Sequence, residues 1–262
     1  MIDERKLRIT VGINSLTAAQ YPAYSNHIQY FFRLGRDFPN IEVVLVNPSR
    51  CSIDRFRNMA VETALNTESD YLLFIDDDVL LPMGSLPKLL DADGDIVAGH
   101  VLVRGYPFKP MAFISVDKND PHKGLRHPAD LSEFGDQEII DVDAIGTSYA
   151  LIKTSLLKKI PKPHFVTGIS STEDIYFCIR ARQVDPNCSI KVHRGVECAH
   201  ILWPELIQPS NREAYSTYFL TQNPQARAEA MKSGDDDRGQ EYIDMLNKLP
   251  DPPKVPAHKE YE

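Results

Sequence analysis

Several features that mark whole classes of protein are scarce in this sequence. Among its 262 residues there are four cysteines and one tryptophan, and no two cysteines form a C-x-x-C pair. In a reducing compartment such isolated cysteines stay as free thiols. We therefore expect Cys51, Cys178, Cys188 and Cys198 to be free, the alternative being that Cys198 is a metal ligand.

Charge and hydropathy exclude further classes. The formal net charge is −8, with 29 Lys and Arg against 37 Asp and Glu, so the chain lacks the broad positive surface of a general nucleic-acid-binding protein. No apolar run approaches the length of a transmembrane span, and Met1-Ile2-Asp3-Glu4 does not have the pattern of a signal peptide. We therefore expect a cytoplasmic protein.

What the chain does have is enough apolar sequence for a large core. An apolar content of 42% over this length suits one α/β domain with an appendage. The predicted strands are 7–13, 41–46, 71–75, 95–99, 138–142, 148–152, 189–193 and 196–201, with 111–116 as a further strand-like piece. The predicted helices are 25–34, 52–65, 86–90 and 171–183. The opening order of strand, helix, strand, helix, strand predicts a mostly parallel sheet with right-handed crossovers.

The chain is expected to divide into three parts. The compact domain is predicted to span residues 1–203, because Trp203-Pro204 follows its last strand. Residues 204–250 are expected to form a helical C-terminal extension. Residues 251–262 are charged and rich in proline, so we expect a flexible tail there.

An acidic cluster follows the third predicted strand. Five residues from Tyr71 to Ile75 run directly into Asp76, Asp77 and Asp78, which reads as a strand buried on both faces that ends at the ligand-binding edge of a parallel sheet. Three adjacent carboxylates repel one another, and a hard cation such as Mg²⁺ relieves that repulsion. Because residues i and i+2 of a strand point the same way, Asp76 and Asp78 are predicted to face one ion. The alternative is a solvated acidic turn.

Two arginines lie near the start of the preceding predicted helix. Arg55 and Arg57 follow the second strand, so this helix also begins at the ligand-binding edge. A helix N-terminus with two guanidinium groups favours an anion such as a diphosphate. The alternative is a pair of surface arginines.

Two further patterns carry opposite interpretations. Ser171-Thr172-Glu173-Asp174 fits a capping box, in which Asp174 only stabilises the helix start, but Asp174 is also a candidate general base. His200 lies between apolar residues, as core histidines do, but it is also a candidate metal ligand, with His193 as its rival.

Taken in order, these motifs resemble family-A (GT-A fold) glycosyltransferases, especially the family 2 type of bacteria and phages. The resemblance covers roughly residues 7–203. It rests on Arg57-Asn58 at a helix start, the D-x-D motif of Asp76–Asp78, Gly146-Thr147 before a strand, and Glu173-Asp174 heading a helix with His200 downstream. The combined spacing is much more specific than a D-x-D motif alone.

The resemblance implies a fold and an activity. The fold would be a single Rossmann-like, mostly parallel sheet flanked by helices. The activity would be metal-dependent transfer of one sugar from a UDP- or GDP-linked donor to an acceptor hydroxyl, with Mn²⁺ or Mg²⁺ as cofactor. The acceptor would be a glycan, a lipid, a protein or modified DNA.

The resemblance also implies roles for individual residues. Asp174 would be the catalytic base, with Glu173 in support. The metal would be held by Asp76, Asp78 and His200. The residues implied at the nucleotide-sugar are Asn14, Ser15, Arg55, Arg57, Asp76, Asp77 and Gly146.

Some positions depart from the family pattern. The turn after the first strand is Asn14-Ser15-Leu16, without the proline that many members carry, which leaves the contact to the base open. The Q-x-x-R-W motif of processive polysaccharide synthases is absent, which favours transfer of a single sugar.

Besides a metal-dependent sugar nucleotidyltransferase, whose Gly-rich loop after the first strand is missing here, two other kinds of protein remain alternatives. One is a phosphatase of the haloacid dehalogenase type, although Leu80 stands where that family has Thr or Val, and two strands precede the acidic one. The other is a nucleotide-sugar-binding module that has no transfer activity.

Overall fold

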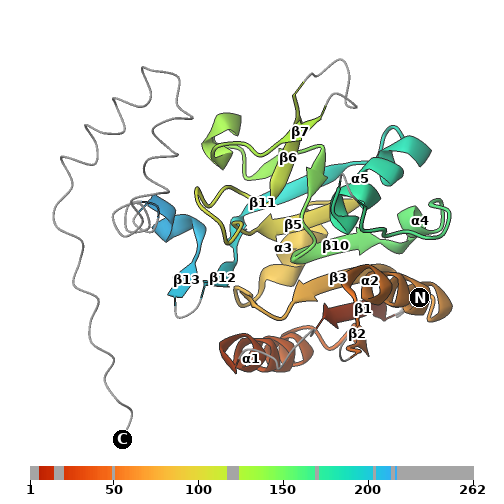
Figure 1. Ribbon diagram of the computed structural model, residues 1–262. Helices are drawn as coiled ribbons and strands as arrows, with labels where there is room; N and C mark the ends of the chain where they lie inside the picture. Colours follow the sequence, from red (N-terminus) through yellow and green to blue (C-terminus); the bar gives the residue numbers. More distant parts are fainter. Residues whose placement is uncertain are drawn as a thin grey trace, which may run out of the picture. The chain divides into compact units, whose positions relative to one another are not determined.

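The computed structural model describes residues 6–14, 21–48, 51–116, 124–168, 171–202, 205–213 and 216. The chain forms two compact units, Met1–Pro209 and Ser210–Glu262. Nearly all the described residues belong to the first unit, which is a mixed α/β structure (Figure 1). The predicted C-terminal helices and tail, as well as Trp203, lie almost entirely outside the described residues.

A seven-stranded sheet forms the centre of the first unit, in the order β2-β1-β3-β10-β5-β11-β8. Its strands are β1 (Leu7–Asn14), β2 (Ile41–Val46), β3 (Tyr71–Asp76), β5 (Ile96–His100), β8 (Ile139–Asp141), β10 (Tyr149–Lys153) and β11 (Ile190–Glu197). β1 runs parallel to β2 and β3, and β5 runs parallel to β11. Strand β10 is antiparallel to its neighbours β3 and β5, and edge strand β8 is antiparallel to β11. The sheet is therefore mostly parallel, as predicted.

Helices cover both faces of this sheet. They are α1 (Tyr21–Asp37), α2 (Ile53–Asn66), α3 (Ser85–Asp91), α4 (Thr154–Leu157) and α5 (Glu173–Val184). One apolar cluster joins the sheet to α2, α4 and α5, and a second joins it to α1 and α3. Strand β3 contributes Leu72 and Phe74 to the first cluster and Leu73 and Ile75 to the second. Its apolar run is thus buried on both faces because each face meets a helical layer.

Short strands extend this framework. Strands β4 (Val79–Leu80), β12 (Ala199–Leu202) and β13 (Glu205–Ile207) form one small sheet, and β6 (Ala112–Ser115), β7 (Leu125–Arg126) and β9 (Ala144–Ile145) form another. Two 3₁₀ turns, Leu131–Phe134 and Pro209–Asn211, complete the described elements. In the first small sheet His200 pairs with Val79, which brings it beside the acidic cluster.

The structure differs from the predicted elements in the strands near His193 and His200. Residues 189–193 and 196–201 are predicted as two strands, because Arg194-Gly195 looks like a turn. Instead β11 is one strand whose register against β5 shifts between His193 and Glu197, and β12 begins at Ala199. A shift of this kind accommodates extra residues without ending the strand.

Two other predictions can be compared with the structure. All four cysteines are buried and free, as predicted. Within the described ranges, no helix combines the length and apolar character needed to cross a membrane.

Candidate functional site

The candidate site begins where β1 and β3 end side by side. Asn14 is the register partner of Asp76, and the backbone amide of Asp76 donates to the Ser148 carbonyl at 2.8 Å. The Asn14 Oδ1 and Thr147 Oγ1 atoms are buried and have no hydrogen-bond partner among the described residues. Buried polar atoms without partners are uncommon, and a bound ligand is one way to satisfy them.

Arg57 connects three elements beneath this edge. Its side chain is 3% exposed, and its guanidinium lies 4.6 Å from the centre of the Phe74 ring. Nη2 contacts Asp76 Oδ1 and Nε contacts Glu173 Oε1, each at 3.2 Å, while Nη1 donates to the Thr147 carbonyl at 3.5 Å. Arg57 therefore links α2 to the end of β3 and to the start of α5.

This placement gives Arg57 a different role from the predicted contact with a diphosphate. Its donors already face protein oxygens, so Arg57 positions Asp76 and Glu173. The other predicted arginine, Arg55, is exposed one half-turn earlier on α2. Both carboxylate oxygens of Asp76 also have partners within the protein, because Oδ1 contacts Arg57 and Oδ2 accepts from the Ser148 hydroxyl at 2.6 Å.

Asp78 and His200 face each other next to this group. Asp78 Oδ1 lies 3.4 Å from His200 Nε2, and His200 Nδ1 lies 2.8 Å from the Leu102 carbonyl oxygen. Burial acts to raise the pKa of Asp78, but the hydrogen bond and charge of His200 and the charge of Arg104 hold that pKa below its ordinary value.

The hydrogen bond to Leu102 limits what the other imidazole nitrogen can do. A carbonyl only accepts, so Nδ1 carries a hydrogen. Nε2 then either carries a second hydrogen or directs its lone pair at the Asp78 carboxylate. In the second state, a cation between the two groups would interact favourably with both. Histidines that bind metals commonly donate their other N–H to a backbone carbonyl in this way.

The donor set fits a divalent ion only in part. Among the described residues, no group of three or more His, Cys, Asp or Glu side chains is placed to hold a metal. Of the three predicted ligands, Asp78 and His200 come together, whereas the oxygens of Asp76 face Arg57 and Ser148. An ion here would have two protein ligands, one carboxylate and one imidazole, and would depend on phosphate and water for the rest.

The predicted catalytic pair heads α5, beside Gly146. Glu173 is 8% exposed, and burial raises its pKa, against the opposing charge of Arg57. Asp174 is half-buried, and its Oδ1 accepts from the Ile175 amide at 2.8 Å and from the Thr172 hydroxyl. Its other oxygen, Oδ2, lies 3.5 Å from where a Cβ on Gly146 would stand.

The capping box predicted at Ser171–Asp174 does not form. The N-cap of α5 is Thr172 rather than Ser171, and its side chain makes no capping hydrogen bond. Asp174 therefore accepts locally through Oδ1, while Oδ2 faces the Gly146 segment. A Cβ on Gly146 would come too close to the end of the Met111 side chain, which would have to shift to make room for it.

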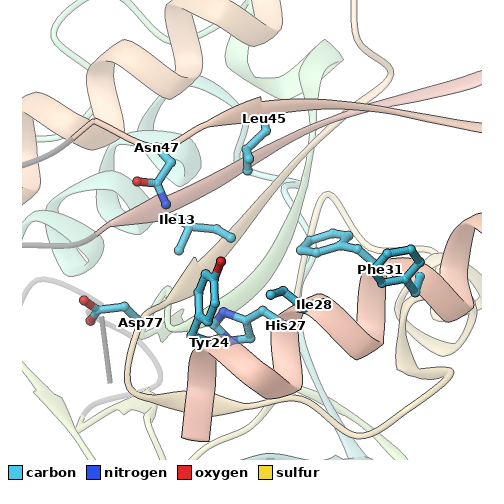
Figure 2. Close-up of a pocket in the computed structure, with 9 residues that line it drawn as sticks. Ile13, Tyr24, His27, Ile28, Phe31, Leu45, Asn47 and Asp77 are labelled. Atoms are coloured by element: carbon cyan, nitrogen blue, oxygen red, sulfur yellow. The ribbon is translucent and has the colours of Figure 1, made fainter. Parts of the chain in front are cut away.

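A cavity of about 490 Å³ lies beside the acidic cluster, between α1 and the ends of β1 and β2. Most of its wall is apolar, with Tyr24 and Leu45 among its lining residues, and its polar members are His27, Asn47 and Asp77. Figure 2 shows Asn47 and Leu45 across the cavity from Tyr24, with Asp77 at one end. Burial lowers the pKa of His27, whose Nε2 donates to the Val79 carbonyl at 2.8 Å.

Most of the residues that line this cavity carry no signal in the sequence. Asp77 is the one predicted site residue in its wall, and Ser15 lies outside the described residues. Tyr24 and His27 had no local signal, because nothing in a single helix shows which sheet edge it faces. The available signal was Asn47-Pro48, which closes a predicted strand at the ligand-binding edge.

Comparisons with known proteins agree on the fold alone. No model of a known protein family matches the chain, and no curated protein sequence matches it either. Among solved structures, the chain is similar to the crystal structure of A197 from STIV, with a TM-score of 0.52 and 19% identity, over 78% of this chain and 90% of that one. At this identity the likeness supports a common α/β architecture.

The geometry of Arg57 leads to a prediction about stability. Replacing Arg57 with Met leaves two partly buried carboxylates without their cation, which should lower the free energy of unfolding by about 3–5 kcal/mol. The measurement is urea unfolding followed by circular dichroism. Arg55→Met, on the same helix but exposed, is the matched control and should change stability by at most about 0.5 kcal/mol. Equal effects of the two substitutions would contradict the linking role of Arg57.

Proposed function

We propose that this chain is a GT-A glycosyltransferase that moves a single sugar from a nucleoside-diphosphate sugar to an acceptor hydroxyl. The observation that carries the proposal is the convergence, at one sheet edge, of the Asp76–Asp78 cluster, His200 and the Glu173-Asp174 pair, with Arg57 between them. Open parallel sheets bind ligands at this edge, and the fold shared with A197 from STIV is compatible with the proposal.

The cavity beside Asp77 suits the nucleoside part of the donor. A nucleobase is planar and apolar on its faces but needs hydrogen bonds at its rim. The cavity offers aromatic and aliphatic walls together with the Asn47 amide, the His27 ring and the Asp77 carboxylate. The neighbouring Asn14 Oδ1 is buried without a partner among the described residues, so it is one further hydrogen-bond acceptor for the nucleotide sugar.

The diphosphate part of the donor would lie near Asp78 and His200. These two residues would hold Mn²⁺ or Mg²⁺, which, when bound, supplies positive charge to the departing diphosphate. The chain's own contribution is to hold the two ligands in place. Leu102 fixes the His200 ring through Nδ1, and the backbone amide of Ile201 donates to the Asp78 carbonyl at 2.8 Å.

The acceptor would approach from the side of Gly146 and α5. In the transfer step, the acceptor oxygen bonds to the anomeric carbon of the sugar as the bond from that carbon to the diphosphate breaks. Asp174 would take the proton of the acceptor hydroxyl through Oδ2, because Oδ1 already accepts from the protein. Glu173, buried against Arg57, would fix the position of the helix start. The acceptor is proposed to be a glycan, a lipid, a protein or modified DNA.

Donor binding is the first test of this proposal. UDP or GDP at about one hundred times its Kd should stabilise the protein by roughly 2.7 kcal/mol and raise its melting temperature. The rise should be largest with Mn²⁺ present. Asp78→Asn should lose most of the rise, whereas Asp91→Asn, at an exposed position on α3, should keep it. A wild-type protein whose melting temperature responds to no nucleoside diphosphate, with or without Mn²⁺, would refute the proposal.

A second test concerns Asp174. If it is the general base, Asp174→Asn should lower kcat for transfer by about 10²–10⁴-fold and leave nucleotide affinity unchanged, because an amide cannot accept the proton. If it only stabilises the helix start, the substitution should lower stability and spare kcat. Asp185→Asn, at the opposite end of α5, is the control. Both variants are compared by steady-state kinetics and melting temperature with an acceptor found by screening.

A further inference from the structure

The segment after β5 forms a hairpin that reaches the candidate site. We call it the 101–111 hairpin. Leu102 bridges Pro110, and the Val103 amide donates to the Lys109 carbonyl at 2.9 Å. Phe108 is 1% exposed, and its amide donates to the Gly105 carbonyl at 2.8 Å. The buried Phe108 side chain anchors the end of the hairpin. The Arg104 side chain therefore extends from a backbone segment that is held in place.

Two contacts join this hairpin to the residues proposed to bind the donor. The Leu102 carbonyl accepts from His200 Nδ1, as described above. Arg104 Nη1 lies 2.9 Å from Asp78 Oδ2. The hairpin thus touches both members of the Asp78–His200 pair, one through its backbone and the other through a charge.

The exposure of the Arg104–Asp78 ion pair is uneven. The Arg104 side chain is 54% exposed, whereas the Asp78 side chain is 12% exposed. Arg104 contacts Asp78 through one guanidinium nitrogen, and within the described ranges no second ion-pair partner is found for it. A guanidinium carries five N–H donors in a planar fork, so most of its donors are available to solvent or to a ligand.

The positive charge and planar shape of the guanidinium favour an anion as that ligand. Asp78 holds the guanidinium from its buried side, which reduces the side-chain freedom that Arg104 would lose on binding. The outer side of a planar guanidinium matches the oxygens of a phosphate, with which it forms paired hydrogen bonds. A diphosphate brought beside Asp76, Asp77 and Asp78 would approach an acidic cluster, so a cationic side chain at this point lowers the cost of binding it.

We propose that Arg104 binds the diphosphate of the nucleotide donor, in addition to any ion held by Asp78 and His200. The inference rests on the proposed function and adds one specific contact to it. The 101–111 hairpin then has two roles in one site. Its Leu102 carbonyl fixes the His200 ring, and its Arg104 side chain binds the phosphate. The chemistry recognised is that of a nucleoside diphosphate, whether free or linked to a sugar.

A simpler role for Arg104 makes the opposite forecast. If Arg104 only neutralises Asp78 in the absence of a divalent ion, it competes with that ion. Its removal would then tighten Mn²⁺ binding and leave nucleotide affinity unchanged or improved. If Arg104 binds the diphosphate, its removal must weaken nucleotide affinity even when Mn²⁺ is saturating. The sign of the change separates the two roles.

The experiment is calorimetric titration of UDP and GDP into the full chain, at saturating Mn²⁺ and separately in EDTA. Arg104→Ala should weaken binding by about tenfold at saturating Mn²⁺, the loss expected for one charge-assisted contact. Arg104→Lys should recover part of the affinity, because it keeps the charge but not the fork. Arg126→Ala, which removes an exposed arginine paired with Glu133, is the matched control and should bind as the wild type does.

The outcomes are separable. Equal or tighter nucleotide binding by Arg104→Ala, with the wild type binding normally, overturns this inference and leaves the proposed function intact. A wild type that binds neither nucleotide refutes the proposed function itself. The melting temperature of each variant checks its fold, and Arg104→Gln replaces Arg104→Ala if the alanine variant is unstable.

Discussion

The ion pairs of Arg57 are the interaction on which the rest of the candidate site depends. A buried guanidinium between Asp76 and Glu173 holds the end of β3 against the start of α5. Burial of charge is costly unless the partners are close and well hydrogen-bonded, and here one cation is shared between two carboxylates and a backbone carbonyl. The arrangement therefore holds the Asp76–Asp78 cluster next to Glu173 and Asp174.

This shared cation has consequences on both sides of the site. On the side of β3, it occupies Asp76 and leaves Asp78 and His200 as the pair available to an ion or a ligand. On the side of α5, it holds Glu173 so that Asp174, the next residue, faces Gly146 with one carboxylate oxygen. If Asp174 is the general base, as proposed, helix α5 and strand β3 hold it on the same sheet edge as Asp78, as proximity catalysis requires.

Local sequence signals predicted much of this framework, because the physics behind them is local. The run from Tyr71 to Ile75 is apolar throughout, which predicts a strand buried between two helical layers. Its end at three carboxylates places the acidic cluster at a sheet edge. Helix α2 begins after Ser52, as its sequence predicted. The proximity of Asp78 and His200, which lie 3.4 Å apart, was implied by the family resemblance and not by a local signal.

Contacts between distant segments were not predictable from one sequence. Arg57 and Glu173 are 116 residues apart, and nothing near either residue shows that they pair. Arg104 belongs to no sequence motif. Its place in the site depends on a hairpin that Phe108 anchors in the core. The cavity wall from α1 was missed for the same reason. Patterns of three or four residues encode the elements, whereas the choice of partner depends on how the elements pack.

The most direct test of the account is pulsed electron paramagnetic resonance of Mn²⁺ bound to the protein together with UDP. The account predicts phosphorus coupling from the diphosphate and nitrogen coupling from one histidine on the same ion, with the nitrogen signal absent in His200→Ala. A spectrum that matches the Mn²⁺–UDP complex in buffer, without a nitrogen coupling, would contradict it.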